Sequence, residues 1–358
     1  MSSSMVAGSK MQADRIIAKP EKFRPVDYVL FAGVTLVIFI VCVGVGSVNL
    51  PFGQTVEVLW NALTGQAQPA DTAVPILLSS RLPRVMCVAL VGASLSIGGA
   101  AMQGLLKNPL ADGSTLGVSS GASTGAILAM VLGLSIPGLP FAGTMVMAIL
   151  FAFLSLIIIL TLAYRLDHTL STNTIILLGI IFSMFMGSVN ALLTTFAGEG
   201  VRHIIFWLMG SLAGSTYMMA GVLAVTTLIC SGILICCARE LNAFAIGEDN
   251  ARHIGVNVKR IRIIVLITVS VLIGVCVSAS GMIGFVGLVT PHMVRMIVGP
   301  NHKRLLPATL FGGASFLMLA DLLARTILSP RELPIGVVTS LIGAIVFLAI
   351  FFRMRKGK

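Results

Sequence analysis

Few residues in this sequence could do acid–base or ionic chemistry, and three of them stand within long apolar runs. His292 follows Pro291, and Asp321 precedes Arg325 by four residues. An aspartate and an arginine at i and i+4 on one helix can neutralise each other, and we favour this interpretation of Asp321 and Arg325 over a direct functional role. The six cysteines also fall in apolar runs, without the spacing of metal ligands.

Motifs of known catalytic chemistry do not occur in the chain. The sequence has no Gly-x4-Gly-Lys-Ser/Thr phosphate loop, no His-Glu-x2-His and no Gly-x-Ser-x-Gly. We therefore predict that the chain has no catalytic residue, holds no metal or cofactor, and is not an enzyme.

The longest charged interruption after the first apolar run is the stretch 239–262, in which eight residues are charged. Its helical spacing and two glycines predict two short helical segments. The residues that carry this pattern are Leu241, Ala245, Gly247, Glu248, Arg252 and Gly255. We interpret the stretch as a folded loop that binds a soluble partner; the alternative is a solvated connection.

Of the 358 residues, 57% are hydrophobic and only 10% are charged, and the mean hydropathy is +1.02. The elements that position the polar groups are therefore apolar segments. Continuous apolar runs of about 20 residues cross a bilayer as helices, and they lack the alternation of a β-barrel. The sequence predicts an all-α integral membrane protein with ten transmembrane helices. The runs are 28–48, 85–106, 115–134, 141–163, 172–196, 214–237, 262–281, 282–298, 305–327 and 334–352.

The predicted organisation is a polar tail, 1–26, followed by one ten-helix domain, 27–358. A short surface helix is expected at 201–210, between two of the runs. Similar Gly- and Pro-containing segments end the second run and lie within the eighth, which is consistent with inverted or duplicated five-helix units. Gly281, Gly284 and Gly287, at the junction of the seventh and eighth runs, fit either close helix packing or irregular backbone along a pathway, whereas Gly117, Gly121 and Gly125 favour close helix packing.

The basic residues indicate the topology. With ten spans and both termini in the cytoplasm, 19 of the 24 Lys and Arg residues fall on the cytoplasmic side. The net charge of +11 is therefore a topology signal, and we predict no nucleic-acid partner. The basic residues left outside include Arg81, Arg84, Arg325 and Arg331, which suit an acidic protein partner; anchoring to lipid phosphates is the alternative.

Five ordered motifs resemble those of one protein family. They are Arg81-Leu-Pro-Arg84, Lys107-Asn-Pro-Leu-Ala-Asp-Gly-Ser-Thr-Leu-Gly-Val-Ser-Ser-Gly-Ala122, Gly284-Phe-Val-Gly-Leu-Val-Thr-Pro-His292, Ala320-Asp-Leu-Leu-Ala-Arg325 and Glu332-Leu-Pro-Ile-Gly-Val-Val338. From about residue 28 onward the chain resembles the permease subunits of ABC importers for ferric siderophores, haem and vitamin B12. Gly113 departs from this pattern, since the family often has Pro there, and Thr290 stands where an aliphatic residue is common.

The resemblance implies a homodimer of vitamin B12 permease-like subunits in a bacterial plasma membrane. It further implies two ATP-binding subunits, which hold the ATP and Mg²⁺, and an extracytoplasmic substrate-binding protein. Residues matching Leu241, Ala245, Gly247, Glu248, Ala251, Arg252 and Gly255 would couple to the ATPase. Those matching Asn108, Leu110, Ser171, Thr172 and Asn173 would lie at the inner gate, and Arg81, Arg84, Arg325 and, by position, Arg331 would dock the binding protein.

Two other function classes stay open at this level. An ion-coupled secondary transporter would need carboxylates at mid-membrane depth, of which the sequence offers few. An intramembrane enzyme is disfavoured by the missing motifs. The cargo among siderophores, haem and corrinoids is not readable from the small and apolar residues of the spans.

Overall fold

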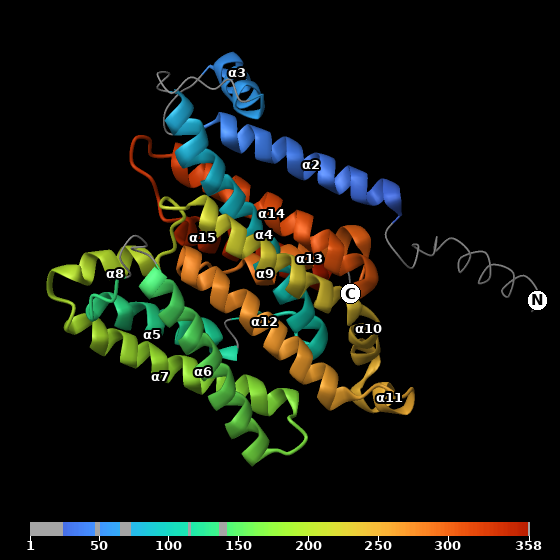
Figure 1. Ribbon diagram of the computed structural model, residues 1–358. Coiled ribbons are helices and arrows are strands. Elements are labelled where there is room, and N and C mark those ends of the chain that lie inside the picture. The colour runs from blue at the N-terminus through green and yellow to red at the C-terminus, as the bar shows by residue number, and fades with distance from the viewer. Residues whose placement is uncertain (1–23, 47–50, 65–72, 114–115, 136–141, 357–358) are drawn as a thin grey trace, which may run out of the picture.

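The structure is a computed structural model that describes residues 24–46, 51–64, 73–113, 116–135 and 142–356, and all regular secondary structure in these ranges is helical (Figure 1). Each predicted apolar run corresponds to one helix. These helices are α2 (Pro25–Gly44), α4 (Leu82–Leu106), α5 (Val118–Val131), α6 (Ala142–Leu166), α7 (Thr172–Thr195), α9 (Tyr217–Cys236), α12 (Val258–Ser280), α13 (Val286–Val298), α14 (His302–Thr326) and α15 (Ile335–Lys356). Within the described ranges, seven are long and apolar enough to cross a membrane. The apolar stretches of α5, α13 and α15 are shorter, at Val118–Val131, Val286–Val298 and Ile335–Ile350.

Shorter helices fill the connections. The predicted surface helix is α8 (Val201–Leu208), which follows the turn η3 (Gly198–Gly200), and the charged stretch forms α10 (Ala238–Ile246) and α11 (Glu248–His253). Two elements were missed, α3 (Phe52–Leu63) and the wide π-type turn η1 (Pro75–Arg81), which extends α4 toward its N-terminus. α3 is amphipathic, with Thr55 and Val58 buried and Trp60 exposed, a pattern that a search for continuous apolar runs does not detect. The predicted tail 1–26 lies almost entirely outside the described residues.

α4 is the central helix of the bundle and packs against α14, α13, α12 and α9 (Figure 1). Glycines allow two close crossings. A Cβ at Gly92 would lie 2.3 Å from the carbonyl oxygen of Gly313 in α14, and a Cβ at Gly99 would lie 1.9 Å from that of Gly287 in α13. In lipid, where hydrophobic burial does not drive helix association, such backbone contacts provide the van der Waals energy of packing.

A second group of helices, α5, α6 and α7, lies beside α12 (Figure 1). Here the predicted small-residue packing is confirmed. A Cβ at Gly121 would lie 1.7 Å from Ser155 Oγ, and one at Gly125 would lie 2.2 Å from the carbonyl oxygen of Met147, so both glycines seat α5 on α6. Gly117 instead precedes α5 with a φ of 72°.

Helix α2 lies on the outside of this body, across α14 (Figure 1). Of its residues only Cys42 and Val43 are buried, and both stand at its C-terminal end. Arg81 Nη1 donates a hydrogen bond of 2.8 Å to the carbonyl oxygen of Gly44, and Arg325 Nη2 donates one of 3.0 Å to that of Cys42. Two arginines therefore satisfy carbonyls that a helix leaves without intrahelical donors at its C-terminus.

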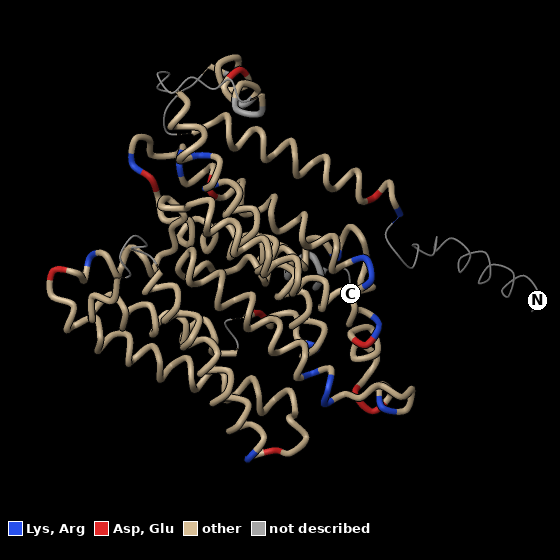
Figure 2. Tube along the Cα trace, viewed as in Figure 1, with Lys and Arg blue, Asp and Glu red and all other residues tan. Residues whose placement is uncertain are grey.

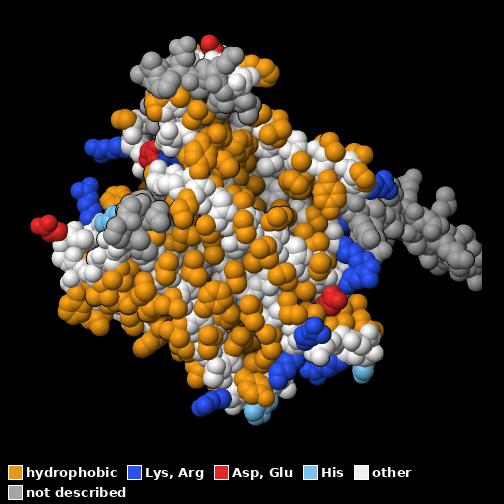
Figure 3. Space-filling model, in the orientation of Figure 1, with side chains coloured by type: hydrophobic (Ala, Val, Ile, Leu, Met, Phe, Trp, Pro, Cys, Tyr) orange, Lys and Arg blue, Asp and Glu red, His pale blue; other side chains and the backbone are white. Residues whose placement is uncertain are grey.

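Charged side chains gather at two opposite ends of the bundle. Figure 2 shows basic residues near α10, α11 and the starts of α12 and α14, and a smaller mixed group at the other end. We call these the basic end and the opposite end. Between them, Figure 3 shows a surface dominated by apolar side chains, as expected for a protein whose middle is solvated by lipid.

Candidate functional site

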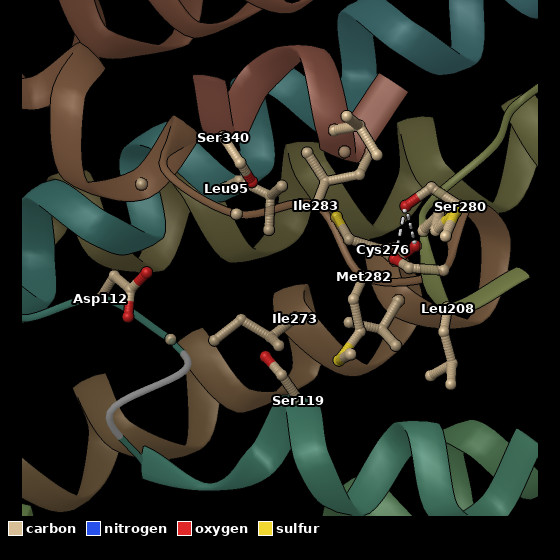
Figure 4. A pocket seen from close by; sticks show the side chains of 18 of the residues that line it. Leu95, Asp112, Ser119, Leu208, Ile273, Cys276, Ser280, Met282, Ile283 and Ser340 are labelled. Carbon is tan, nitrogen blue, oxygen red and sulfur yellow. Dashed lines mark hydrogen bonds between the residues drawn. The ribbon is translucent and has the colours of Figure 1, made fainter. Parts of the chain in front are cut away.

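A cavity of about 510 Å³ lies where α12 ends and α13 begins. Its wall is built from the segment 280–287 together with parts of α4, α5, α8, α12 and α15. Figure 4 shows Asp112 on one side of the cavity, with Ser280 and Cys276 on the opposite side. Among the described residues of the lining, Asp112 carries the one charged side chain, and the rest are small, apolar or hydroxyl groups.

The backbone beside the cavity is not helical from Gly281 to Phe285, as one of the two interpretations of this glycine cluster expected. Gly281 has a φ of 68°, and a Cβ there would lie 2.1 Å from the carbonyl oxygen of Trp207, so only glycine fits this close approach. The segment is fixed by a hydrogen bond of 2.8 Å from Ser211 N to the carbonyl oxygen of Ser280. Irregular backbone at membrane depth is tolerated where it lines a cavity, which is how many transporters build a pathway.

At the basic end, α10 and α11 form a pair of short helices that we call the coupling hairpin, after the ATPase-coupling role that the family resemblance predicts for it. Gly247, with a φ of 148°, ends α10 and begins α11. The two-helix prediction is confirmed. Leu241 and Ala245 lie in α10, whereas Glu248 and Arg252 lie in α11 beyond Gly247, so these four residues do not line one continuous helix face. Within α10, Leu241 is fully buried and Ala245 is exposed.

The coupling residues separate into inward and outward groups. Leu241 and Ala251 are buried, Gly247 and Glu248 are half-buried, and Ala245, Arg252 and Gly255 are exposed. Two further side chains, which the sequence did not single out, are Ile246, 73% exposed, and Ile254, 68% exposed. Large apolar groups exposed on an otherwise charged hairpin are typical of a protein-binding surface.

Glu248 faces the body of the protein. Its carboxylate accepts a hydrogen bond from Arg262 Nη2, and Thr172 Oγ1 lies 3.5 Å from Glu248 Oε1. Arg262, in the first turns of α12, is fully buried, and its Nη1 also donates to the carbonyl oxygens of Thr169 at 3.0 Å and Leu170 at 2.5 Å. Sequence analysis missed this role, because Arg262 looked like one of several basic residues flanking a span.

The expected inner-gate residues occupy two places. Asn108 Oδ1 accepts a hydrogen bond of 2.9 Å from Leu110 N, which builds a tight turn at the end of α4 and leaves Leu110 51% exposed. Ser171, Thr172 and Asn173 begin α7, beside the coupling hairpin. No hydrogen bond joins the two groups within the described part of the chain, and their gating role stays a prediction.

The turn before α7 is held by Asp167. Its carboxylate accepts hydrogen bonds from Thr169 N at 2.8 Å, Thr169 Oγ1 at 2.6 Å and Ser171 N at 2.9 Å. These donors hold the pKa of Asp167 well below its usual range, with the side-chain hydrogen bond from Thr169 the largest cause. The carboxylate therefore stays ionised at physiological pH, and the turn is not a pH switch.

The opposite end contains a buried ionic cluster. Arg84 Nη2 lies 2.9 Å from Asp321 Oδ1, Arg84 Nη1 lies 2.7 Å from Glu332 Oε2, and Arg325 Nε lies 2.9 Å from Asp321 Oδ2. The predicted i, i+4 pair of Asp321 and Arg325 is thereby confirmed. Both residues are at most 2% exposed, so the pair is internal to the bundle.

The four arginines expected to dock a partner are differently placed. Arg81, Arg84 and Arg325 are buried, and their guanidinium groups bind carboxylates or carbonyls within the chain. Arg331, on the loop before α15, is exposed. Docking by the first three would require their side chains to leave these partners, whereas docking by Arg331 requires no such change. Which of them binds a partner stays a prediction.

Within the described ranges, no group of three His, Cys, Asp or Glu side chains lies close enough to hold a metal ion. The five cysteines other than Cys236 are buried, and all six are free thiols.

Comparisons with known proteins cover nearly the whole chain. The sequence profile of the FecCD transport family matches residues 34–353. The uncharacterized ABC transporter permease protein YvrB of Bacillus subtilis is 41% identical over 91% of this chain and 92% of that protein. The cobalamin import system permease protein BtuC of Halobacterium salinarum is 39% identical over 81% of this chain and 78% of its own length.

Two further similarities concern transport of large metal complexes. The hemin transport system permease protein HmuU of Yersinia pestis is 37% identical over 90% of this chain and 96% of that protein. A solved structure described as an inward-facing metal-chelate type ABC transporter aligns with a TM-score of 0.80 and 31% identity, over 92% of this chain and all of that one.

Proposed function

The chain belongs to the FecCD transport family, and from this premise we propose that it is the membrane-spanning permease subunit of an ABC importer. Members of this family are transport permeases and not enzymes. The cargo we propose is a metal chelate: an iron siderophore, haem or cobalamin. The named relatives for cobalamin and hemin support this class of cargo.

The observation that carries the proposal is the cavity of about 510 Å³ beside the irregular segment 281–285. Its small and apolar lining offers few groups that could hold a large chelate tightly during passage. A secondary transporter coupled to ions would need a relay of ionisable groups at this depth, and Asp112 is the one charged group among the described lining residues.

The proposed assembly is a homodimer, in which two copies of this cavity face one another across a two-fold axis. A shared space of this kind would admit a chelate larger than either half alone. Two ATP-binding subunits complete the inner side. This chain would bind no cofactor, and ATP and Mg²⁺ would be held by those partners.

The basic end is the proposed cytoplasmic end, since basic residues are retained there in membrane proteins. The ATP-binding subunits would then contact the exposed residues of the coupling hairpin, including Ile246 and Ile254. The opposite end would receive an extracytoplasmic substrate-binding protein, with the exposed Arg331 as the first contact for its acidic residues.

Reconstitution in proteoliposomes tests this function. The permease, its ATP-binding subunit and its binding protein are incorporated with ATP inside, and uptake of a ferric siderophore, haem and cobalamin is measured in parallel. We expect uptake of one of these cargoes that stops when the phosphate-loop lysine of the partner ATPase is replaced. Uptake by this chain alone, driven by a proton or sodium gradient, would instead establish the ion-coupled alternative.

A further inference from the structure

Arg262 joins two elements that have different predicted tasks. One Nη of its guanidinium binds Glu248, the first residue of α11, and the other binds the carbonyl oxygens of Thr169 and Leu170. The first element belongs to the coupling hairpin, and the second is the turn that leads into α7. A planar guanidinium with donors on both sides is suited to bridge two such groups, whereas a lysine ammonium is a point charge.

The turn that Arg262 binds is stiff. Asp167 holds it from within through three hydrogen bonds, and Leu170 adopts a φ of 55°, in the left-handed region that non-glycine residues rarely occupy. Ser171, the next residue, is the N-cap of α7. A stiff turn transmits a displacement of its carbonyls to the helix that follows.

The other half of the coupling hairpin has its own attachment. Asn242 Oδ1 in α10 accepts hydrogen bonds of 2.8 Å from His302 N, and Asn242 Nδ2 donates one of 2.9 Å to Asn301 Oδ1. α10 is therefore tied to the start of α14. The link from the hairpin to the α6–α7 turn runs through Glu248, with Arg262 and Thr172 as its described partners.

We propose that Arg262 is a positioning residue that couples the hairpin to the gate: it makes α11 and the start of α7 move together when the ATP-binding subunits displace the hairpin. This inference rests on the proposed function. In this proposal Glu248 makes an internal link and does not contact the ATPase directly. The outward residues of the hairpin bind the ATPase, and Arg262 transmits the movement of the hairpin to α7.

The first test compares Arg262→Gln with Arg260→Gln, the same substitution at an exposed position two residues earlier. Both variants are reconstituted with the ATPase and binding protein, and substrate uptake and ATP hydrolysis are measured together. For Arg262→Gln we expect substrate moved per ATP to fall by about tenfold, the factor that corresponds to about 1.4 kcal/mol, while affinity for the ATPase is unchanged. Arg260→Gln should behave as the wild type.

Two more variants distinguish the bridge from a simple ion pair. Arg262→Lys should restore part of the coupling, because an ammonium can reach Glu248 but serves the carbonyls poorly. The exchange Glu248→Arg with Arg262→Glu keeps the charge pair yet removes the donors to Thr169 and Leu170, so it should stay uncoupled. Full rescue by the exchange would overturn the role of the carbonyl contacts.

If a variant loses uptake for another reason, the proposal can still be tested by measuring the distance between α11 and the turn before α7. Spin labels at Asn250→Cys and His168→Cys, both exposed positions, are placed in a Cys236→Ser background because Cys236 is the exposed native thiol among the six. We expect the distance between the two labels of one subunit to stay narrow with and without ATP in the otherwise native complex, and to become broad or ATP-dependent with Arg262→Gln. A distance that stays narrow in that variant, or normal coupling in it, would refute the relay; absence of ATP-driven uptake by the wild type would refute the proposed function instead.

Discussion

At the scale of single residues, Asp321 is the centre of the ionic cluster at the opposite end. It accepts Arg84 from α4 and Arg325 from its own helix, and its side chain is 1% exposed. A buried carboxylate is tolerated only when partners compensate for its lost hydration. The three charges therefore depend on one another, and removal of one leaves the others uncompensated.

We expect Asp321→Asn to destabilise the protein by about 3–5 kcal/mol, the cost of breaking a buried ion pair from one side. Thermal unfolding of the purified protein in detergent measures the effect. Asp249→Asn is the matched control, because the Asp249 side chain is 87% exposed and its partner Arg252 is a surface residue. Equal melting temperatures for Asp321→Asn and the wild type would contradict the structural role of the cluster.

Arg331 gives the prediction for docking of the binding protein. An exposed ion pair contributes about 0.2–1 kcal/mol, so Arg331→Ala should weaken binding by no more than about fivefold. Arg331→Glu should weaken it further, because repulsion replaces attraction, and the difference should shrink at high salt. Binding that is insensitive both to the reversal and to salt would show that Arg331 is not a docking residue.

The same residues show what sequence could and could not provide. The pair of Asp321 and Arg325 was predictable from its i, i+4 spacing, since both partners share a helix. The ion pair between Arg84 and Asp321 joins residues that are 237 positions apart in the sequence, and it forms because α4 crosses α14. The bridge made by Arg262 depends in the same way on Leu170, 92 residues earlier in the chain. Tertiary contacts of that kind leave no local pattern, which is why the burial of Arg81 and Arg84 could not be predicted from the sequence.

At the scale of the elements, the crossing of α4 with α13 brings two backbones into contact. We expect Gly99→Ala to separate these helices, because a Cβ there would lie 1.9 Å from the carbonyl oxygen of Gly287. The exposed helical Gly221, which has no atom within 4 Å of an added Cβ, provides the control: Gly221→Ala should be neutral or slightly stabilising, as alanine favours helix.

Thermal stability in detergent and the yield of folded protein measure both glycine variants. A Gly99→Ala protein as stable as the Gly221→Ala protein would show that α4 and α13 can repack at little cost. Continuous apolar runs were sufficient to predict the long helices, whereas the glycine cluster left both a break at 281–285 and close packing open. The amphipathic α3 and the extension of α4 by η1 could not be found this way, because neither is an uninterrupted apolar run.

At the scale of the whole molecule, the distribution of basic residues predicts the orientation in the membrane. A reporter enzyme fused to the C-terminus should be active in the cytoplasm, and one inserted at Ala67 should report the outside. Ala67 lies outside the described residues, so this is a prediction from the sequence. Reporters that place both sites on the same side of the membrane would contradict the ten-span topology.

The attachment of α2 has a consequence for how the protein is made. α2 is synthesised first, yet the arginine that binds the carbonyl of Cys42 follows it by 283 residues. At a translation rate of about 5–20 residues per second, roughly 15–60 s pass before Arg325 is available. During that interval α2 has to be stable in the bilayer without its partners, which its almost wholly apolar sequence allows. Its contacts with α14, at Thr35 as well as at Cys42, form only afterwards, so the rest of the molecule assembles against a helix that is already inserted.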